Sequence, residues 1–207
     1  MHSSREGRYR FASAAQRNLM WAGVAGGIAF AVYVRTLAPG LRGVVDTPMF
    51  QFIGRVLGVA HHPGYPLYSV LTYPFSYLPV GSLAYRINLF SALCGAIAVA
   101  TTFLIARRLG CRILVSMAAA LGMACGRAFW SQAIIAEVYM LHAALIAGSL
   151  LMLLRWGATG RPRDFYASIG IFALGLGNTR RSSASLPESP CTRSLPTGGS
   201  SFGCARS

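Results

Sequence analysis

Four apolar runs, each about as long as a membrane-spanning helix, dominate this sequence. The hydrocarbon core of a bilayer is about 30 Å thick, so a helix that rises about 1.5 Å per residue needs roughly 20 apolar residues to cross it. The runs are Leu19–Leu37, Ile87–Ala106, Ile113–Trp130 and Ala133–Leu154, and a fifth, Phe165–Gly177, stops too early to span. This pattern predicts an all-α fold, a polytopic transmembrane helix bundle of four full spans and a truncated fifth.

Composition and charge support a membrane protein. The chain is 54% hydrophobic and 12% charged, yet its formal net charge is +14, and all 19 basic residues are arginine. Such a charge could indicate binding to nucleic acid or to anionic lipid. The arginines lie mostly at the edges of the apolar runs, which is typical of topology signals and not of a basic stripe on a polar helix. We therefore expect a membrane lipid environment and no nucleic-acid partner.

The arginine distribution predicts the orientation. The first run follows a basic segment but has no clear small-x-small cleavage site after it, which favours an uncleaved anchor over a signal peptide. With a cytoplasmic N-terminus, the inner segments hold ten arginines and the outer segments five. The inner set is Arg5, Arg8, Arg10, Arg17, Arg107, Arg108, Arg112, Arg155, Arg161 and Arg163; the outer set is Arg35, Arg42, Arg55, Arg86 and Arg127. We expect a multi-pass protein of the cell membrane.

The first outer segment, Ala38–Tyr85, contains two short apolar stretches that predict interfacial helices. In the first, Thr47 is a plausible helix cap, Pro48 occupies the first helical position, and apolar residues follow at helical spacing. These are Met49, Phe52, Ile53, Val56, Leu57 and Ala60. The second stretch, Leu67–Ser82, is interrupted by prolines and therefore predicts an interfacial or re-entrant helix. Between them, His61–Pro66 forms a stiff corner of two prolines and a glycine.

Two acidic residues are the candidates for catalysis. Asp46 follows the first span and Glu137 lies near the outer end of the fourth, so both are expected on the same side at similar depth. A carboxylate held ionised by a helix N-terminus could take a proton from an acceptor hydroxyl. Alternatively, Asp46 only caps a helix, and Glu137 only forms a buried ion pair with Arg86 or Arg127.

Several polar residues on the same side are candidates for binding a phosphate group. Arg86, with Asn88 two residues later, opens the second span, where an arginine fork suits a lipid-linked phosphate; snorkelling to headgroups is the alternative. His61 and His62 could donate to a phosphate or simply face solvent.

No ligand spacing predicts a metal site, the five cysteines form no CxxC pair, and no cofactor is expected. Gly23 and Gly27 form a weak GxxxG packing motif.

Three stretches together resemble a known family. The chain reads HHPGYPLY at residues 61–68, RINL at 86–89 and AEVY at 136–139. In this combination and order the chain resembles the bacterial domain-of-unknown-function 2723 family, whose members are related to a eukaryotic protein O-mannosyltransferase among the GT-C glycosyltransferases. The resemblance covers about residues 19–178. It matches Asp46 to the family's loop acid, places Tyr65 in its loop stretch, and matches Glu137 and Tyr139 to its fourth-helix motif.

The resemblance implies a membrane glycosyltransferase that transfers a sugar from a polyprenyl-phosphate-linked donor to a hydroxyl of a protein or glycan acceptor, including protein Ser/Thr O-mannosylation. Two departures stand out: no second carboxylate follows Asp46, and His62 replaces a proline. A non-catalytic membrane protein, such as a transporter or an assembly subunit, is the alternative reading. None of the four predicted spans carries an acid near its centre, which disfavours a proton-coupled carrier.

Three regions are expected along the chain: a basic cytoplasmic tail at residues 1–18, an incomplete transmembrane GT-C-like domain at 19–177, and a tail at 178–207. The tail has eight serines and four arginines and a composition typical of disorder. It begins where a fifth span would continue. A frameshifted or truncated gene is the hypothesis for this tail, and the chain would then be an N-terminal fragment and an inactive product.

Overall fold

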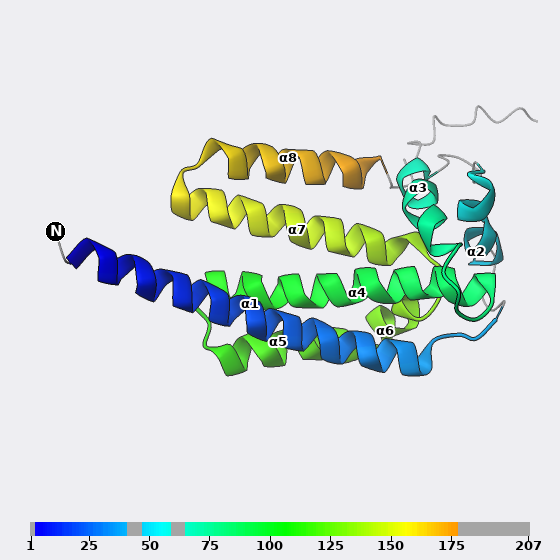
Figure 1. Ribbon diagram of the computed structural model, residues 1–207, viewed down its shortest axis with the longest axis horizontal. Coiled ribbons are helices and arrows are strands. Elements are labelled where there is room, and N and C mark those ends of the chain that lie inside the picture. The colour runs from blue at the N-terminus through cyan, green and yellow to red at the C-terminus, as the bar shows by residue number, and fades with distance from the viewer. Residues whose placement is uncertain (1–2, 41–46, 59–64, 178–207) are drawn as a thin grey trace, which may run out of the picture.

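The computed structural model describes residues 3–40, 47–58 and 65–177, and within these ranges the regular structure is entirely helical (Figure 1). The side chains of the first helix are described from residue 14 onward. The helices are α1 (Ser3–Thr36), α2 (Thr47–Val56), α3 (Pro66–Phe75), α4 (Leu83–Arg108), α5 (Ile113–Cys125), α6 (Arg127–Ala133), α7 (Val138–Thr159) and α8 (Pro162–Leu176). The tail predicted at residues 178–207 lies outside the described ranges, so its proposed origin stays a prediction.

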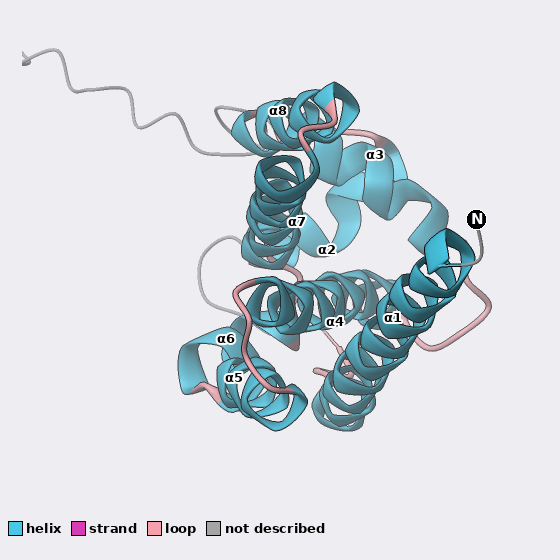
Figure 2. Cartoon of the chain, turned by 90° about the vertical axis from the view of Figure 1, so that its left-hand side faces the viewer, coloured by secondary structure: helices cyan, strands magenta, loops and turns pink. Residues whose placement is uncertain are grey.

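The helix α4 is the centre of the bundle. It packs against α1 on one side and α7 on another, α5 packs along it, and α8 covers α7 (Figure 2). Because consecutive long helices run in opposite directions, the C-termini of α4 and α7 lie at one end of the bundle and their N-termini at the other. We call the end where α4 and α7 finish the basic end, after Arg107, Arg108, Arg112, Arg155, Arg161 and Arg163. The opposite end, where α2 and α3 lie and α4 and α7 begin, is the α2–α3 end (Figure 1).

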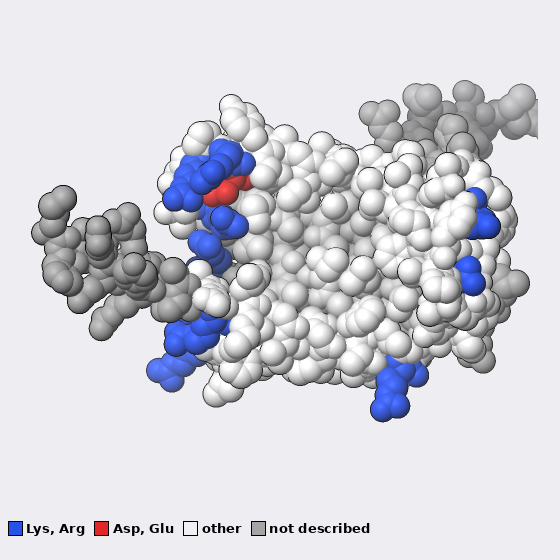
Figure 3. Space-filling view, viewed as in Figure 1, with Lys and Arg blue, Asp and Glu red and all other residues white. Residues whose placement is uncertain are grey.

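Three helices are long and apolar enough to cross a membrane: Ala14–Thr36, Leu83–Arg108 and Val138–Thr159. The chain is thus a multi-pass membrane protein. The third predicted run is not one straight helix, because α5 and α6 meet at an angle of 66° near Gly126; counted as one broken span, this pair would be a fourth. Figure 3 shows arginines gathered at the basic end and a wide middle band free of charge, as a protein surface facing lipid requires.

Small residues let α1 approach α4 closely. Ala22, Ala25, Gly26 and Ala29 are buried, and a Cβ added to Gly26 would lie 3.0 Å from the carbonyl oxygen of Ala96. The GxxxG pair Gly23 and Gly27 does not make this contact, since a Cβ at either position would meet nothing within 4 Å. The packing motif predicted from the sequence was therefore placed on the wrong face of the helix.

Two short helices form in the segment where the sequence predicts them, although α3 ends at Phe75 and not at Ser82, and they pack tightly on each other. Pro66 occupies the first turn of α3, and a Cβ added to Gly54 of α2 would lie 2.2 Å from Thr72 Oγ1 of α3. The face of α2 that packs against the rest of the protein carries both polar and apolar side chains. Its buried residues are Thr47, Phe50, Gln51, Ile53 and Gly54, whereas Phe52 and Val56 are 49% and 63% exposed. Apolar side chains on the outer face suit a helix at a membrane surface.

Candidate active site at the α2–α3 end

A buried hydrogen bond joins the start of α2 to the start of α7. Thr47 Oγ1 donates to Glu137 Oε1 at 2.6 Å, a short distance expected when the acceptor is a carboxylate. Glu137 is only 9% exposed, and it is the N-cap residue of α7 with extended backbone. It therefore precedes the helix, whereas the sequence predicted it one turn inside the span. Its backbone N–H also donates to Ser91 Oγ of α4 at 3.4 Å.

A second buried polar link connects α2, α4 and the end of α1. Gln51 Nε2 donates to Asn88 Oδ1 at 3.2 Å, and Asn88 Nδ2 donates to the Ala38 carbonyl oxygen at 2.9 Å. Both side chains are almost completely buried. Polar side chains buried in a helix bundle are costly unless their hydrogen bonds are satisfied. Here the Gln51 side-chain oxygen has no hydrogen-bond partner within the described part of the chain.

Tyr68 brings a phenol into the same region. It is fully buried between the rings of Phe50 and Phe90, with ring centroids at 5.4 and 5.7 Å, and its hydroxyl also lacks a hydrogen-bond partner among the described residues. Burial, and secondly the negative charge of Glu137, raise the pKa of Tyr68 well above its ordinary value. The nearby Ser91 hydroxyl opposes this shift but is not in hydrogen-bonding geometry with the phenol. Tyr68 is thus a neutral phenol with an unused donor.

Arg86 closes the turn between α3 and α4. Its guanidinium donates to three backbone carbonyls, those of Ser76 at 2.9 Å, Val80 at 2.9 Å and Gly81 at 3.2 Å. Among the described residues, neither Arg86 nor Arg127 forms an ion pair with Glu137, so that alternative for the acid is not what the structure shows. A guanidinium has five N–H donors, and the contacts to the turn leave two of them for another partner.

A cavity of about 500 Å³ opens beside the Gln51–Asn88 link. Gln51 lines it on one side, and the rest of its lining comes from the end of α1, from α2 and from the start of α4. The lining residues are Gly40, Gln51, Phe52, Ser82, Leu83 and Ala84. Its volume lies within the range of small-molecule sites, about 300–1,000 Å³. It is mostly apolar, so it could hold a hydrocarbon group near one amide.

The other predicted site residues divide into two groups. Asp46, His61 and His62 lie outside the described residues. Tyr65 is buried and packs edge-on against Phe50 at 5.3 Å, whereas Tyr139 of α7 is 58% exposed. Within the described ranges, no group of three or more His, Cys, Asp or Glu side chains could hold a metal ion.

Sequence reasoning missed Gln51, Ser91 and Tyr68 as parts of the site and assigned Thr47 only a capping role. A signal was present for two of them. Gln51 stands alone among apolar residues in the first interfacial stretch, and Ser91 follows Asn88 by three residues, which places both on one face of α4. Because polar side chains are costly inside apolar helices, such residues are candidates for a functional role.

Comparison with known proteins identifies the family. Residues 46–186 match the family described as the protein O-mannosyl-transferase TMEM260 N-terminal domain. The chain belongs to this family. It is also 34% identical over 149 residues to "Protein O-mannosyl-transferase TMEM260" of Mus musculus, an alignment that covers 70% of this chain and 21% of that protein. The chain therefore spans about a fifth of the mouse protein's length. No solved structure matches the chain.

Membership of the TMEM260 N-terminal family confirms the predicted relationship to a protein O-mannosyltransferase, while the narrower bacterial family stays a prediction. The family match begins at Asp46 and includes α2, α3, α4 and the start of α7, which carry most of the candidate site. Thr47, Gln51, Asn88 and Glu137 thus all lie within the segment that is shared with the family.

Proposed function

We propose that this chain is, or is part of, a membrane glycosyltransferase that transfers a sugar from a polyprenyl-phosphate-linked donor to a hydroxyl acceptor, with protein Ser/Thr O-mannosylation as the specific reaction. The observation that carries the proposal is the Thr47–Glu137 hydrogen bond within a segment shared with the TMEM260 N-terminal family. It supports a site in which the residue after Asp46 is anchored to a second carboxylate at one end of the bundle.

In the proposed reaction, Asp46 is the general base. The acceptor oxygen forms a bond to the anomeric carbon of the sugar, and the bond between that carbon and the donor's phosphate oxygen breaks. The hydroxyl proton passes to the Asp46 carboxylate, and polyprenyl phosphate leaves with the electron pair of the broken bond. Glu137 was predicted to act alongside Asp46. Its hydrogen bond to Thr47 supports the narrower role of positioning the start of α2.

The leaving phosphate needs cationic or hydrogen-bonding groups. Arg86 has two N–H donors beyond those that hold the turn, and because the turn fixes its side chain, little conformational entropy is lost when it binds an anion. His61 and His62 are the proposed additional donors. In this proposal Asn88 positions Gln51 through their hydrogen bond. Tyr65 and Tyr139 are proposed to border the substrate. The apolar cavity beside Gln51 is the proposed place for the first part of the donor's lipid.

The test is sugar transfer in membranes that contain the protein. We expect labelled mannose to move from polyprenyl-phosphate mannose to a Ser/Thr peptide, and Asp46→Asn to reduce this transfer by about 100-fold or more, within the range typical of a lost general base. Asp164→Asn, which changes an acid at the basic end, is the matched control and should leave the rate within about twofold. The assay uses membranes that contain no other copy of the unaltered protein. Unchanged transfer by Asp46→Asn in these membranes rejects Asp46 as the general base.

The alternative functions predict different results. A transporter or assembly subunit would show no transfer with any sugar donor, and an inactive product would show none and would also be degraded rapidly in cells. Pulse-chase measurement of protein lifetime separates these two, because an assembly subunit is stable when its partners are present. Transfer that depends on Asp46 excludes both.

A further inference from the structure

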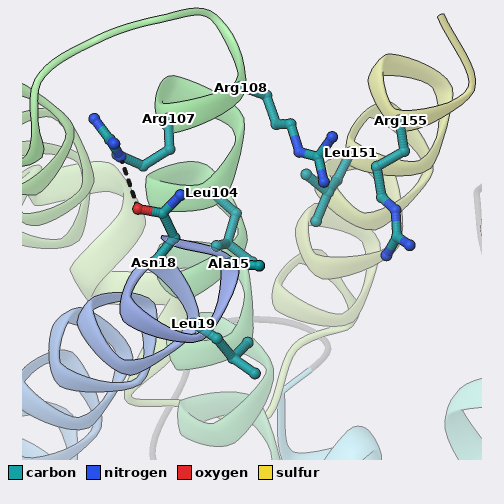
Figure 4. A pocket seen from close by; sticks show the side chains of 8 residues that line it. All are labelled: Ala15, Asn18, Leu19, Leu104, Arg107, Arg108, Leu151 and Arg155. Atoms are coloured by element: carbon teal, nitrogen blue, oxygen red, sulfur yellow. Dashed lines mark hydrogen bonds between the residues drawn. The ribbon is translucent and has the colours of Figure 1, made fainter. Parts of the chain in front are cut away.

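A pocket at the basic end contains a cationic site that the proposed transferase reaction does not use. It has a volume of about 260 Å³ and lies where α1, α4 and α7 come together. Its lining combines apolar and basic side chains: Ala15, Asn18, Leu19, Leu104, Arg107, Arg108, Leu151 and Arg155. Figure 4 shows Arg108 and Arg155 extending into the space between α4 and α7 near Leu151, while Arg107 turns the other way, towards Asn18.

The three arginines of this pocket are not equivalent. Arg107 is already committed, since it donates to Asn18 Oδ1 at 3.0 Å and to the Cys111 carbonyl oxygen. Arg155 lies 3.9 Å from Asp164 Oδ1 through one terminal nitrogen, but its Nε is buried and has no hydrogen-bond partner among the described residues. The Arg155 side chain as a whole is 40% exposed, so its guanidinium can still donate to a partner that enters the pocket.

The position of the pocket restricts what that partner can be. Arg108 is the last residue of α4, and Arg155 lies one turn before the end of α7, so the pocket opens where two apolar spans leave the hydrocarbon core. Phospholipid headgroups occupy this level of a bilayer. Leu19, Leu104 and Leu151 provide an apolar wall for the upper part of acyl chains, and the arginines provide donors for a phosphate.

We propose that this pocket binds the phosphate of an anionic phospholipid in the leaflet at the basic end, with Arg108 and Arg155 as its main donors and the Asn18 amide as a further one. Simple snorkelling of arginines to the interface would spread the side chains over the surface. Here two guanidinium groups from different helices line one cavity together with apolar side chains.

The test uses the full chain purified in detergent, with phosphatidylglycerol as the probe. We expect phosphatidylglycerol to raise the unfolding temperature, and native mass spectrometry to retain one such lipid per chain. Phosphatidylcholine and inorganic phosphate at equal concentration should have little effect. A stabilisation by inorganic phosphate that equals the lipid effect would overturn the assignment to a lipid.

Arg108→Gln is the decisive variant, because Arg108 is exposed and its side chain forms no hydrogen bond or ion pair with another described residue. We expect the phosphatidylglycerol concentration for half-maximal stabilisation to rise about fivefold, as the loss of one arginine near a lipid headgroup implies. Arg108→Lys should shift it by less than about twofold. Arg163→Gln removes the same charge from the same end but lies outside the pocket, so it should bind like the original protein. Equal weakening in Arg108→Gln and Arg163→Gln would show general charge attraction and overturn the proposal.

Discussion

Thr47 and Glu137 are 90 residues apart in the sequence, and their hydrogen bond of 2.6 Å ties the first residue of α2 to the residue that precedes α7. The bond lies in the protein interior, because Thr47 is 1% exposed and Glu137 9%. It links the short helix α2 to α7, which is long and apolar enough to cross a membrane. The position of α2 at the end of the bundle therefore depends on this polar contact and on the Gln51–Asn88 hydrogen bond as well as on apolar packing.

Replacing Thr47 with valine tests this contact. The substitution keeps the shape of the side chain but leaves a buried carboxylate without one of its donors, which typically costs about 1–3 kcal/mol. We expect Thr47→Val to lower the unfolding temperature in detergent. Thr101→Val is the control, since the Thr101 hydroxyl donates to a carbonyl of its own helix. Equal stability of the two variants would show that the link from α2 to α7 carries no weight.

Gly54→Ala should separate α2 from α3. The added Cβ would lie 2.2 Å from Thr72 Oγ1 and 2.9 Å from Thr72 Cβ, so the helices must move apart, at a typical cost of about 1–3 kcal/mol. Faster proteolysis of the α2–α3 end is the expected result. Gly27→Ala, where a Cβ meets nothing within 4 Å, should have no such effect. Thr72→Ala in the Gly54→Ala background should restore part of the loss, and the absence of any rescue would contradict the predicted clash.

Tyr68→Phe should leave stability at neutral pH unchanged or raise it, because it removes a buried hydroxyl that has no hydrogen-bond partner among the described residues. The raised pKa of Tyr68 also predicts a pH dependence. The folded state keeps the phenol protonated, so this contribution to stability is complete below the unfolded pKa of about 10 and is lost as pH rises above it. Denaturant unfolding between pH 8 and 11 measures this loss. It should be smaller in Tyr68→Phe, and an equal loss in both proteins would assign it to other groups.

Arg86→Lys should loosen the turn between α3 and α4. A lysine cannot donate to three carbonyls that are arranged around a planar guanidinium, and hydrogen bonds from charged groups are each worth about 1.5–3 kcal/mol. We expect protease cleavage within residues 76–82 to accelerate and the unfolding temperature to fall. Arg127→Lys, an exchange at an exposed position, is the control. Cleavage at the same rate in both variants would rule out a structural role for the guanidinium.

The long helices could be predicted from the sequence because burial in lipid leaves a strong signal over about 20 residues. The bend near Gly126 was less accessible: Arg127 marks an interruption of the third run, but the sequence does not reveal that the chain turns by 66° there. The sequence also indicated the wrong face of α1 for close packing. Small residues occur at four-residue spacing on two faces, at Gly23 and Gly27 and at Ala25 and Ala29, and only the packing of the helices distinguishes them.

The candidate site was predictable in its position and less so in its composition. Glu137 was identified from the cost of placing an acid in an apolar segment, a local property of the sequence. Its partner Thr47 could not be identified, because a hydrogen bond between residues 90 apart depends on how α2 and α7 meet. The same holds for Gln51 and Asn88, whose contact exists only once α2 lies across the start of α4.

The break between α5 and α6 has a consequence for the surrounding lipid. The helix α5 has 13 residues, and at about 1.5 Å per residue it reaches only about 20 Å, against a hydrocarbon thickness of about 30 Å. A short apolar helix draws the two leaflets towards each other at its side. If the bent α5–α6 pair crosses the membrane, the bilayer beside it should therefore be compressed, and that flank of the molecule should be sensitive to acyl-chain length and favour thinner membranes.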